Sequence, residues 1–452
     1  MLQSMRHRPS VAWLGSQLRH GAETCENLTV RCLDVIDVLN PELNAFVTLA
    51  REQAVQEARE RDVELASGRD RGPLHGIPIA VKDTIDTASL LTTMGSSHFA
   101  GNVPTQDAAC VAAARRAGAV VIGKTTTHEF AYGPTGDRSA QGPSRNPIDP
   151  TRMSGGSSGG SAVAVAAGMA PLALGTDTGG SARIPAAFCG VVGFKPSHAR
   201  LSMEGVFPLA PSLDDVGLLA ATVQDCRLLW MALAGPTPHR SIGPDRVPAA
   251  VHIGWLDPAL LCATDPRIRD RALAMLTEGR ERPHRVEHAV APELIELLEA
   301  YTHIQSSEAY ALHADLVATA PGLYDDEVLA RLKAASQTAG WEYVRATQTR
   351  DRVHTVIAQL FTRFQVLAMP TLPVTAPVLG SRALQVDGTT VSTRDALLAL
   401  TSSWNVLGLP ALSMPAGLVD GLPVGLQLIA ATGQEDLLLS IAREIEENQT
   451  SR

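Results

Sequence analysis

The sequence predicts an α/β fold, in which helices cover a sheet of short, buried strands. Short apolar segments such as 77–81 (IPIAV) and 366–369 (VLAM) alternate with longer segments whose apolar residues recur at helical spacing. Of the 452 residues, 45% are hydrophobic and 19% are charged, which is enough apolar material for a large ordered core.

Composition narrows the class of protein. The formal net charge is −9 and there is no basic run, so we expect no nucleic-acid partner. The six cysteines are scattered without C-x-x-C spacing, which predicts free thiols in a reducing compartment. Without a signal-peptide pattern or a run of about 18 apolar residues, we expect a cytoplasmic protein with no membrane segment.

The first part of the chain predicts helices and then a strand that ends on a lysine. Helical spacing covers Thr29–Leu39 and Phe46–Gly68, where we find no residues with evident chemistry. Pro73–Asp83 predicts a short buried strand that ends at Lys82. An alanine- and arginine-rich helix follows at Ala108–Ala117, and after it a strand begins at Ala119.

Two short motifs resemble ligand sites and are rejected. Gly118–Thr125 (GAVVIGKT) fits the phosphate-loop pattern, but its four internal residues are themselves the predicted strand, so no flexible loop is available. His128–Glu129 begins like the zinc motif H-E-x-x-H, but Tyr132 stands where the second histidine is required.

The rest of the chain predicts loops, a helical section and a return to strands. Residues 133–153 are rich in Gly, Pro, Ser and Asn and predict a long loop. The segment Gly235–Pro248 is a proline- and glycine-rich break, and Pro266–Phe364 beyond it is largely helical and charged. Val366–Met369 predicts a buried strand, and Ala396–Leu439 predicts further strands and helices.

The densest chemical signal is a pair of glycine–serine clusters. GGSSGGS occupies Gly155–Ser161 and GTDTGGS occupies Gly175–Ser181, with the apolar run Ala162–Gly168 between them. Glycines let backbone N–H groups approach a ligand closely, and serine hydroxyls can act as a nucleophile or a proton relay. No histidine near the clusters is a convincing base, which directs attention to Lys82 in GIPIAVKD.

These segments resemble the amidase signature family from about Leu74 to Pro211, and more weakly over Asn405–Ala430. Lys82, Ser157 and Ser181 match the family's catalytic trio one by one, and the serines keep the family's separation of 181 − 157 = 24 residues. The resemblance implies hydrolysis of amide C–N bonds. In this mechanism Ser181 attacks the carbonyl, Ser157, in a cis peptide, relays the proton, and Lys82 is the base.

The resemblance also implies the architecture. It predicts a single domain over 1–452, built on a mixed, twisted sheet of about eleven strands with helices on both faces. Within it we distinguish N-terminal helices at 1–70, a signature core at 71–235, a variable, substrate-facing helical section at 249–365, and a C-terminal part of the core at 366–452.

Other site residues follow from the same block. The backbone N–H groups of Thr178, Gly179, Gly180 and Ser181 are expected to form the oxyanion hole. Asp177 and Arg183 flank this turn, and we expect them to pair structurally. The acidic pair Asp214–Asp215 is interpreted as a loop cap or salt-bridge partner rather than a metal site.

Aromatic and apolar residues near the serines are the candidates for the substrate pocket, and each of them can face either the pocket or the core. They are Phe130, Tyr132, Met153, Phe188 and Trp404. An apolar pocket would prefer hydrophobic or aryl amides, with carbamates (urethanes) and esters as further substrates. No motif requires a cofactor or a metal, and both a monomer and a homodimer are compatible with the sequence.

Two alternatives remain. A histidine-based serine hydrolase would use GGSSG at Gly155–Gly159 as its nucleophile elbow, but no buried strand precedes this segment and the last histidine is His354. The second is the amide-hydrolysing subunit of a tRNA-dependent amidotransferase, which hands ammonia to a partner. That relative keeps an acidic residue seven positions before the asparagine of its NLAGLP motif, whereas this chain has Leu398 before Asn405.

Overall fold

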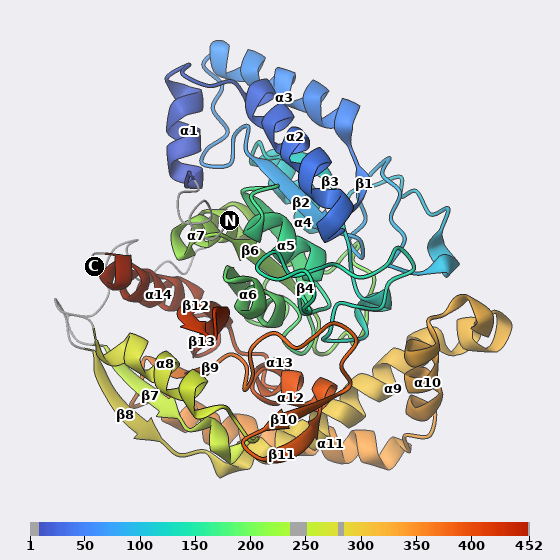
Figure 1. The fold of residues 1–452 in the computed structure, drawn as a ribbon, viewed down its shortest axis with the longest axis vertical. Coiled ribbons are helices and arrows are strands. Elements are labelled where there is room, and N and C mark those ends of the chain that lie inside the picture. The colour runs from blue at the N-terminus through green and yellow to red at the C-terminus, as the bar shows by residue number, and fades with distance from the viewer. Residues whose placement is uncertain (1–8, 236–250, 279–283, 451–452) are drawn as a thin grey trace.

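The computed structural model describes residues 9–235, 251–278 and 284–450. Its central element is an eleven-stranded mixed sheet in the order β1-β3-β2-β4-β6-β5-β12-β13-β9-β7-β8 (Figure 1). The strands are β1 (Phe46–Leu49), β2 (Pro78–Lys82), β3 (Val120–Thr125), β4 (Leu172–Asp177), β5 (Val192–Lys195), β6 (Asp215–Ala220), β7 (His252–Leu256), β8 (Arg285–Ala289), β9 (Val366–Pro370), β12 (Ala411–Val419) and β13 (Leu422–Ile429). A separate hairpin joins β10 (Ala383–Val386) to β11 (Thr389–Ser392).

Helices cover both faces of this sheet, which confirms the predicted fold class. They are α1 (Val11–Arg19), α2 (Cys25–Leu43), α3 (Arg51–Ala66), α4 (Ala109–Arg116), α5 (Gly159–Ala166), α6 (Arg183–Cys189), α7 (Val223–Ala234), α8 (Pro266–Thr277), α9 (Glu296–Thr319), α10 (Asp326–Ala335), α11 (Gly340–Leu360), α12 (Thr393–Ala399), α13 (Ser402–Val406) and α14 (Glu435–Thr450). Helices α5 and α6 pack together on one face, and α7, α8 and α14 pack on the other.

Helices α1, α2 and α3 gather at one end of the molecule, and the long helices α9, α10 and α11 lie together at the opposite side (Figure 1). Helix α9 packs against α10, α11 and the short helix α13, which follows α12 in the chain. This arrangement brings part of the charged, helical section over the glycine–serine region.

One predicted element is wrong. Phe46–Leu49 was expected to begin a helix, but it forms the edge strand β1, which pairs antiparallel with β3. Its sequence FVTL is aromatic and β-branched, and pairing with the exposed edge of β3 outweighs the helical spacing that continues into α3. The helix proper begins at Arg51.

The structure also bears on the expectations for the cysteines, for membrane-spanning helices and for the proline- and glycine-rich break. All six cysteines are free thiols, and five of them are buried, as predicted. Within the described ranges, none of the helices has both the length and the apolar composition to cross a membrane. The proline- and glycine-rich break lies, apart from Gly235, outside the described residues, so the division of the chain into sections stays a prediction.

Candidate active site

Two adjacent parallel strands bring Lys82 to the glycine–serine clusters. Strands β2 and β4 pair with Val81 opposite Leu174, so Lys82 at the end of β2 lies beside the last residues of β4. The Lys82 Nζ donates hydrogen bonds to Thr176 Oγ1 at 2.6 Å and to Ser157 Oγ at 2.6 Å. The lysine therefore meets one of the two predicted catalytic serines directly.

The surroundings of Lys82 favour its neutral form. The side chain is fully buried, and this desolvation lowers its pKa to about 7, although the Asp177 and Asp214 carboxylates act in the opposite direction. Only a neutral amine can accept a proton, so the burial of this lysine allows it to act as a base near neutral pH.

Ser157 lies just before helix α5. The Gly156–Ser157 peptide bond is cis, as the resemblance implies. Ser157 is fully buried, and its carbonyl oxygen accepts a hydrogen bond from the backbone N–H of His128 at 3.2 Å. Its hydroxyl is thus held against Lys82.

Helix α5 is built from small residues because it packs very close to neighbouring backbone. All eight of its residues are buried. A Cβ atom on Gly160 would lie 2.5 Å from the carbonyl oxygen of Ala45 and 2.5 Å from the backbone nitrogen of Thr126. The first glycine–serine cluster therefore has a packing role as well as a chemical one.

The turn that carries Ser181 joins β4 to α6. Ser181 is 7% exposed, and its carbonyl oxygen accepts a hydrogen bond from the Ser158 N–H at 3.2 Å. The Ser158 hydroxyl donates to the Thr176 carbonyl at 3.0 Å and accepts from the Thr176 N–H at 3.2 Å. Ser158 therefore ties the two glycine–serine clusters to each other.

One of the four predicted oxyanion donors has a hydrogen-bond acceptor within the turn. The Gly180 N–H donates to Asp177 Oδ1 at 2.8 Å, so this group already has an acceptor within the turn. The N–H groups of Thr178, Gly179 and Ser181 have no protein acceptor among the described residues. These three groups are the donors left for an oxyanion.

Asp177 and Arg183 form a buried structural pair, as predicted. The guanidinium contacts both carboxylate oxygens, with NH2–Oδ1 at 2.8 Å and Nε–Oδ2 at 3.0 Å. Arg183 also donates to Gln427, Asn405 and the carbonyl oxygen of Thr401. Although burial opposes ionisation, the adjacent Arg183 lowers the pKa of Asp177 to about 2. The pair fixes the turn that carries Ser181.

The acidic pair after the signature block acts as cap and salt bridge. Asp214 accepts a hydrogen bond from the Thr178 hydroxyl at 2.6 Å and from two backbone N–H groups of the preceding loop. Asp215 pairs with Lys195 at 2.9 Å. Burial raises the pKa of Asp214 to about 6. Over the described part of the chain, no group of three or more His, Cys, Asp or Glu residues could hold a metal ion.

The rejected phosphate-loop motif is a strand, as predicted. Residues 120–125 form β3, and the buried Lys124 ammonium group donates to the Ile85 carbonyl oxygen and the Thr87 hydroxyl. A lysine occupied in this way serves the fold rather than a phosphate group.

A small cavity opens beside Ser181. It is lined by Ala131, Tyr132, Gly133, Pro134, Ser181, Tyr301, Gln305, Arg394 and Leu398. Tyr301 and Gln305 come from helix α9, and Arg394 and Leu398 come from helix α12. The wall therefore combines phenol, amide and guanidinium groups with a few apolar contacts.

The predicted apolar pocket differs from this cavity. Of the five aromatic and apolar candidates, only Tyr132 lines it. Phe130 packs into an aromatic cluster with Phe207 at 5.3 Å and His313 at 4.6 Å between ring centroids. Trp404 is fully buried and donates its indole N–H to the Leu400 carbonyl.

The remaining two candidates, Met153 and Phe188, are also buried in the core. Phe188 packs beside Gly155, where a Cβ atom would lie 3.0 Å from its ring. Large apolar side chains near the serines are used to fill space beneath the site, which is why their proximity in sequence did not make them pocket residues.

Sequence reasoning missed four residues of this site. Thr176 lies within GTDTGGS, but the prediction considered only the serine of that motif as a chemical group. Tyr301 and Gln305 are four positions apart on a helix, so they share one face, but nothing in the sequence shows what that face covers. Arg394 lies one turn before Leu398 on α12, a spacing that could have indicated a shared face with it.

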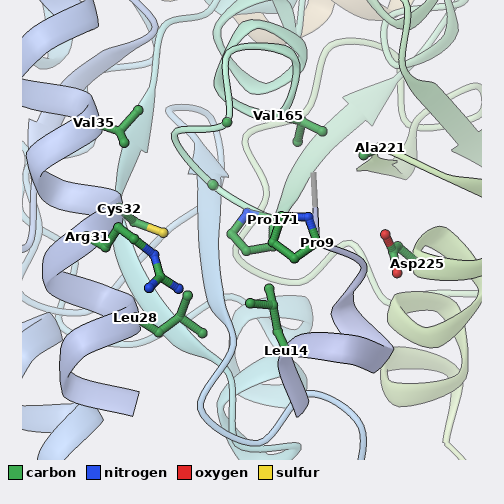
Figure 2. Close-up of a pocket in the computed structure, with 12 residues that line it drawn as sticks. Pro9, Leu14, Leu28, Arg31, Cys32, Val35, Val165, Pro171, Ala221 and Asp225 are labelled. Atoms are coloured by element: carbon green, nitrogen blue, oxygen red, sulfur yellow. The ribbon is translucent and has the colours of Figure 1, made fainter. Parts of the chain in front are cut away.

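A separate cavity of about 160 Å³ lies between α1, α2 and the end of α5 (Figure 2). Its walls are mostly apolar, with Arg31 and Asp225 as the charged side chains that line it. It contains none of the three predicted catalytic residues.

Comparisons with known proteins identify the family of this chain. The sequence profile of the Amidase family matches residues 27–439. The chain is 37% identical to a Picosynechococcus protein that is named as one subunit of glutamyl-tRNA(Gln) amidotransferase, over 91% of this chain and 92% of the relative.

Solved structures show the same relationship. An amidase crystal structure superposes with a TM-score of 0.89 at 33% identity, covering 97% of this chain and 99% of that one. The peptide amidase from Stenotrophomonas maltophilia gives a TM-score of 0.82 at 31% identity, covering 98% and 97%. The chain therefore belongs to the amidase signature family, whose members hydrolyse amide C–N bonds.

Proposed function

We propose that Ser181, Ser157 and Lys82 carry out amide hydrolysis in this family member through an acyl-enzyme. The observation that supports this most strongly is the contact between the buried Lys82 amine and the Ser157 hydroxyl at 2.6 Å. A buried lysine that is placed against a serine, with no carboxylate of the described residues within hydrogen-bond distance, is poorly explained by a structural role.

In the first step, the Ser181 oxygen forms a bond to the substrate carbonyl carbon. The proton of Ser181 passes to the Ser157 oxygen, and the Ser157 proton passes to the lone pair of neutral Lys82. The carbonyl oxygen becomes an oxyanion, which the N–H groups of Thr178, Gly179 and Ser181 would stabilise. Losing one such donor typically costs about 3 kcal/mol.

Collapse of this intermediate breaks the C–N bond. The proton held by Lys82 returns through Ser157 to the leaving nitrogen, which departs as an amine or as ammonia. A water molecule then attacks the ester on Ser181, and the same two residues accept its proton and return one to the Ser181 oxygen. The products are a carboxylic acid and an amine.

The polar wall of the cavity favours a small, polar amide. This departs from the hydrophobic or aryl amides expected from the sequence, because Tyr301, Gln305 and Arg394 face the space beside Ser181. Carbamates and esters present the same carbonyl group to the same donors, and their hydrolysis stays a prediction.

A second candidate is hydrolysis of glutamine within a tRNA-dependent amidotransferase. On sequence similarity it is the better supported candidate, since the relatives carrying that subunit's name are 34–37% identical over more than 90% of both chains. It would require a protein partner that receives ammonia. The residue that separates the candidates is Leu398, which lines the cavity where the glutamine-hydrolysing relative keeps an acidic side chain.

The test is hydrolysis of pentanamide, acetanilide, 4-nitrophenyl carbamate and glutamine by wild type, Ser181→Ala and Lys82→Ala. Turnover of any amide that both variants reduce by about 1000-fold supports the proposed mechanism. Turnover of glutamine alone would favour the second candidate. Activity that survives in Ser181→Ala would contradict the assignment of the nucleophile.

A further inference from the structure

Arg394 is the charged side chain among the nine residues that line the cavity at Ser181. Its guanidinium NH2 donates to the Gln305 side-chain oxygen at 3.1 Å. The Gln305 amide in turn donates to the Tyr301 hydroxyl at 2.5 Å. Gln305 and Tyr301 are both buried, so the guanidinium is anchored to a fixed wall rather than free to move in solvent.

This anchor connects Arg394 to the oxyanion turn. The Tyr301 hydroxyl lies so close to Gly179 that a Cβ atom there would come within 2.2 Å of it. The row of side chains Arg394, Gln305 and Tyr301 therefore reaches from the partly exposed Arg394 guanidinium to the backbone beside Ser181. A substrate that reacts at Ser181 would extend along this row.

The positive charge of Arg394 lacks a buried counter-charge. Its ion-pair partner is the neighbouring Asp395, at 3.5 Å, whose side chain is 72% exposed and therefore strongly screened by water. The nearby Arg331 differs, because it pairs with Glu327 at 3.1 Å and stacks on the Tyr132 ring at 5.0 Å. Arg394 is thus accessible to an anion in the cavity.

The same cavity holds an unused hydrogen-bond donor. The Tyr132 hydroxyl is buried and has no hydrogen-bond partner among the described residues. A buried hydroxyl without a partner is costly unless a ligand or water satisfies it. This observation is independent of Arg394 and points to a polar ligand in the same space.

The residue at position 398, Leu398, argues against binding of a substrate ammonium group in this cavity. It lies one turn after Arg394 on α12 and lines the same cavity. None of the nine lining residues, all within the described ranges, is Asp or Glu, so a substrate ammonium group would find no carboxylate to pair with. The cavity is therefore matched in charge to an anion and not to an amino acid zwitterion.

From these observations we propose that the substrate is an amide whose acyl portion carries a carboxylate, without an ammonium group beside it, and that Arg394 binds this carboxylate. Monoamides of dicarboxylic acids are the simplest members of the class. The proposal rests on the proposed amide hydrolysis at Ser181 and specifies its substrate.

Three probes of nearly equal size test it by ammonia release. Glutaramate carries the terminal carboxylate, pentanamide lacks it, and glutamine adds an α-ammonium group to glutaramate. For wild type we expect kcat/KM for glutaramate to exceed the values for pentanamide and for glutamine by about tenfold or more, the size of a hydrogen-bonded charge interaction.

Substitutions of Arg394 test whether this residue causes the preference for glutaramate. Arg394→Gln should lower the ratio of kcat/KM for glutaramate to that for pentanamide by about 10- to 100-fold, and Arg394→Lys should restore part of it. The matched control is Arg345→Gln, on α11, which stacks on Trp341 and does not line this cavity; it should leave the ratio unchanged. Leu398→Asp should raise glutamine turnover relative to glutaramate.

An unchanged ratio in Arg394→Gln would overturn the proposal, as would a wild-type preference for glutamine over glutaramate. Inhibition by the product provides a check with an uncharged substrate: in pentanamide hydrolysis, glutarate should inhibit wild type more strongly than pentanoate, and Arg394→Gln should remove that difference. If wild type hydrolyses pentanamide but shows no preference for glutaramate, the substrate class is wrong while the amide hydrolase remains. If Ser181→Ala does not abolish ammonia release, the proposed mechanism itself fails.

Discussion

Lys82 Nζ and Thr176 Oγ1 lie 2.6 Å apart across two neighbouring parallel strands. The register of β2 and β4 fixes this distance, and the Ser158 hydroxyl, bonded to both the N–H and the carbonyl of Thr176, holds β4 against the segment that carries Ser157. The proposed base, Lys82, is therefore held by a strand end on one side and a serine on the other. We propose that Thr176 positions Lys82, and the first prediction follows from this role.

Thr176→Val should lower kcat/KM by about tenfold, because Lys82 loses one of its two hydrogen-bond partners. The charged ammonium form loses more than the neutral amine, so the pKa of Lys82 should fall further and the acid side of the pH profile should move to lower pH. Thr176→Ser should restore both properties. The control is Thr29→Val, a buried threonine of α2 whose hydroxyl has no partner among the described residues; an equal change in both variants would argue against a positioning role.

The pH dependence of the reaction should report the burial of Lys82. Because burial lowers its pKa to about 7, the fraction of neutral base rises with pH through that value. We expect kcat/KM for an uncharged amide to increase about tenfold per pH unit below pH 6 and to level off above pH 8. A profile that is flat from pH 5 to 8 would contradict Lys82 as the base.

Asp177→Asn should destabilise the protein by about 3 kcal/mol at pH 7, because it leaves the buried Arg183 without its anionic partner. The native-state pKa of Asp177 is lowered to about 2, so the stabilisation is present above the unfolded-state value of about 3.9 and is lost as pH falls towards 2. Urea unfolding at pH 7 and pH 3 should show the difference between variant and wild type shrinking. An equal difference at both pH values would mean that charge is not its origin.

Gly179→Ala should reduce kcat by about tenfold or more. The added Cβ atom would lie 2.2 Å from the Tyr301 hydroxyl, so either the tyrosine or the oxyanion turn must move. Gly322→Ala is the matched control, since nothing lies within 4 Å of its added Cβ atom. Equal rates for both variants would show that the turn tolerates displacement.

The sequence predicted the α/β fold, the buried strand that ends at Lys82, and the two segments that carry Ser157 and Ser181. These features succeed because they depend on local information: apolar runs for strands, and glycine where backbones pack closely, as at Gly160. The edge strand Phe46–Leu49 was missed because four residues do not separate an edge strand from the start of a helix.

The side chains that line the cavity at Ser181 were mostly not predicted, for a different reason. Part of its wall comes from α9 and α12, which are about 90 residues apart in the chain and far from the serines in sequence. Whether Trp404 faces the core or the site depends on tertiary packing, and here it points to the Leu400 carbonyl within the core. The contact between Arg394 and Gln305 joins two helices that are distant in the chain, so it could not be predicted from either residue alone.

Acylation of Ser181 with the help of Lys82, as proposed above, can be tested directly. A fluorophosphonate reagent reacts with activated serines, and peptide mass spectrometry locates the modified residue. We predict a single adduct on the peptide that contains Ser181, absent in Ser181→Ala and formed at least about 100-fold more slowly in Lys82→Ala. An adduct on Ser157 instead, or amide hydrolysis at the wild-type rate after Ser181 has been fully modified, would show that Ser181 is not the nucleophile.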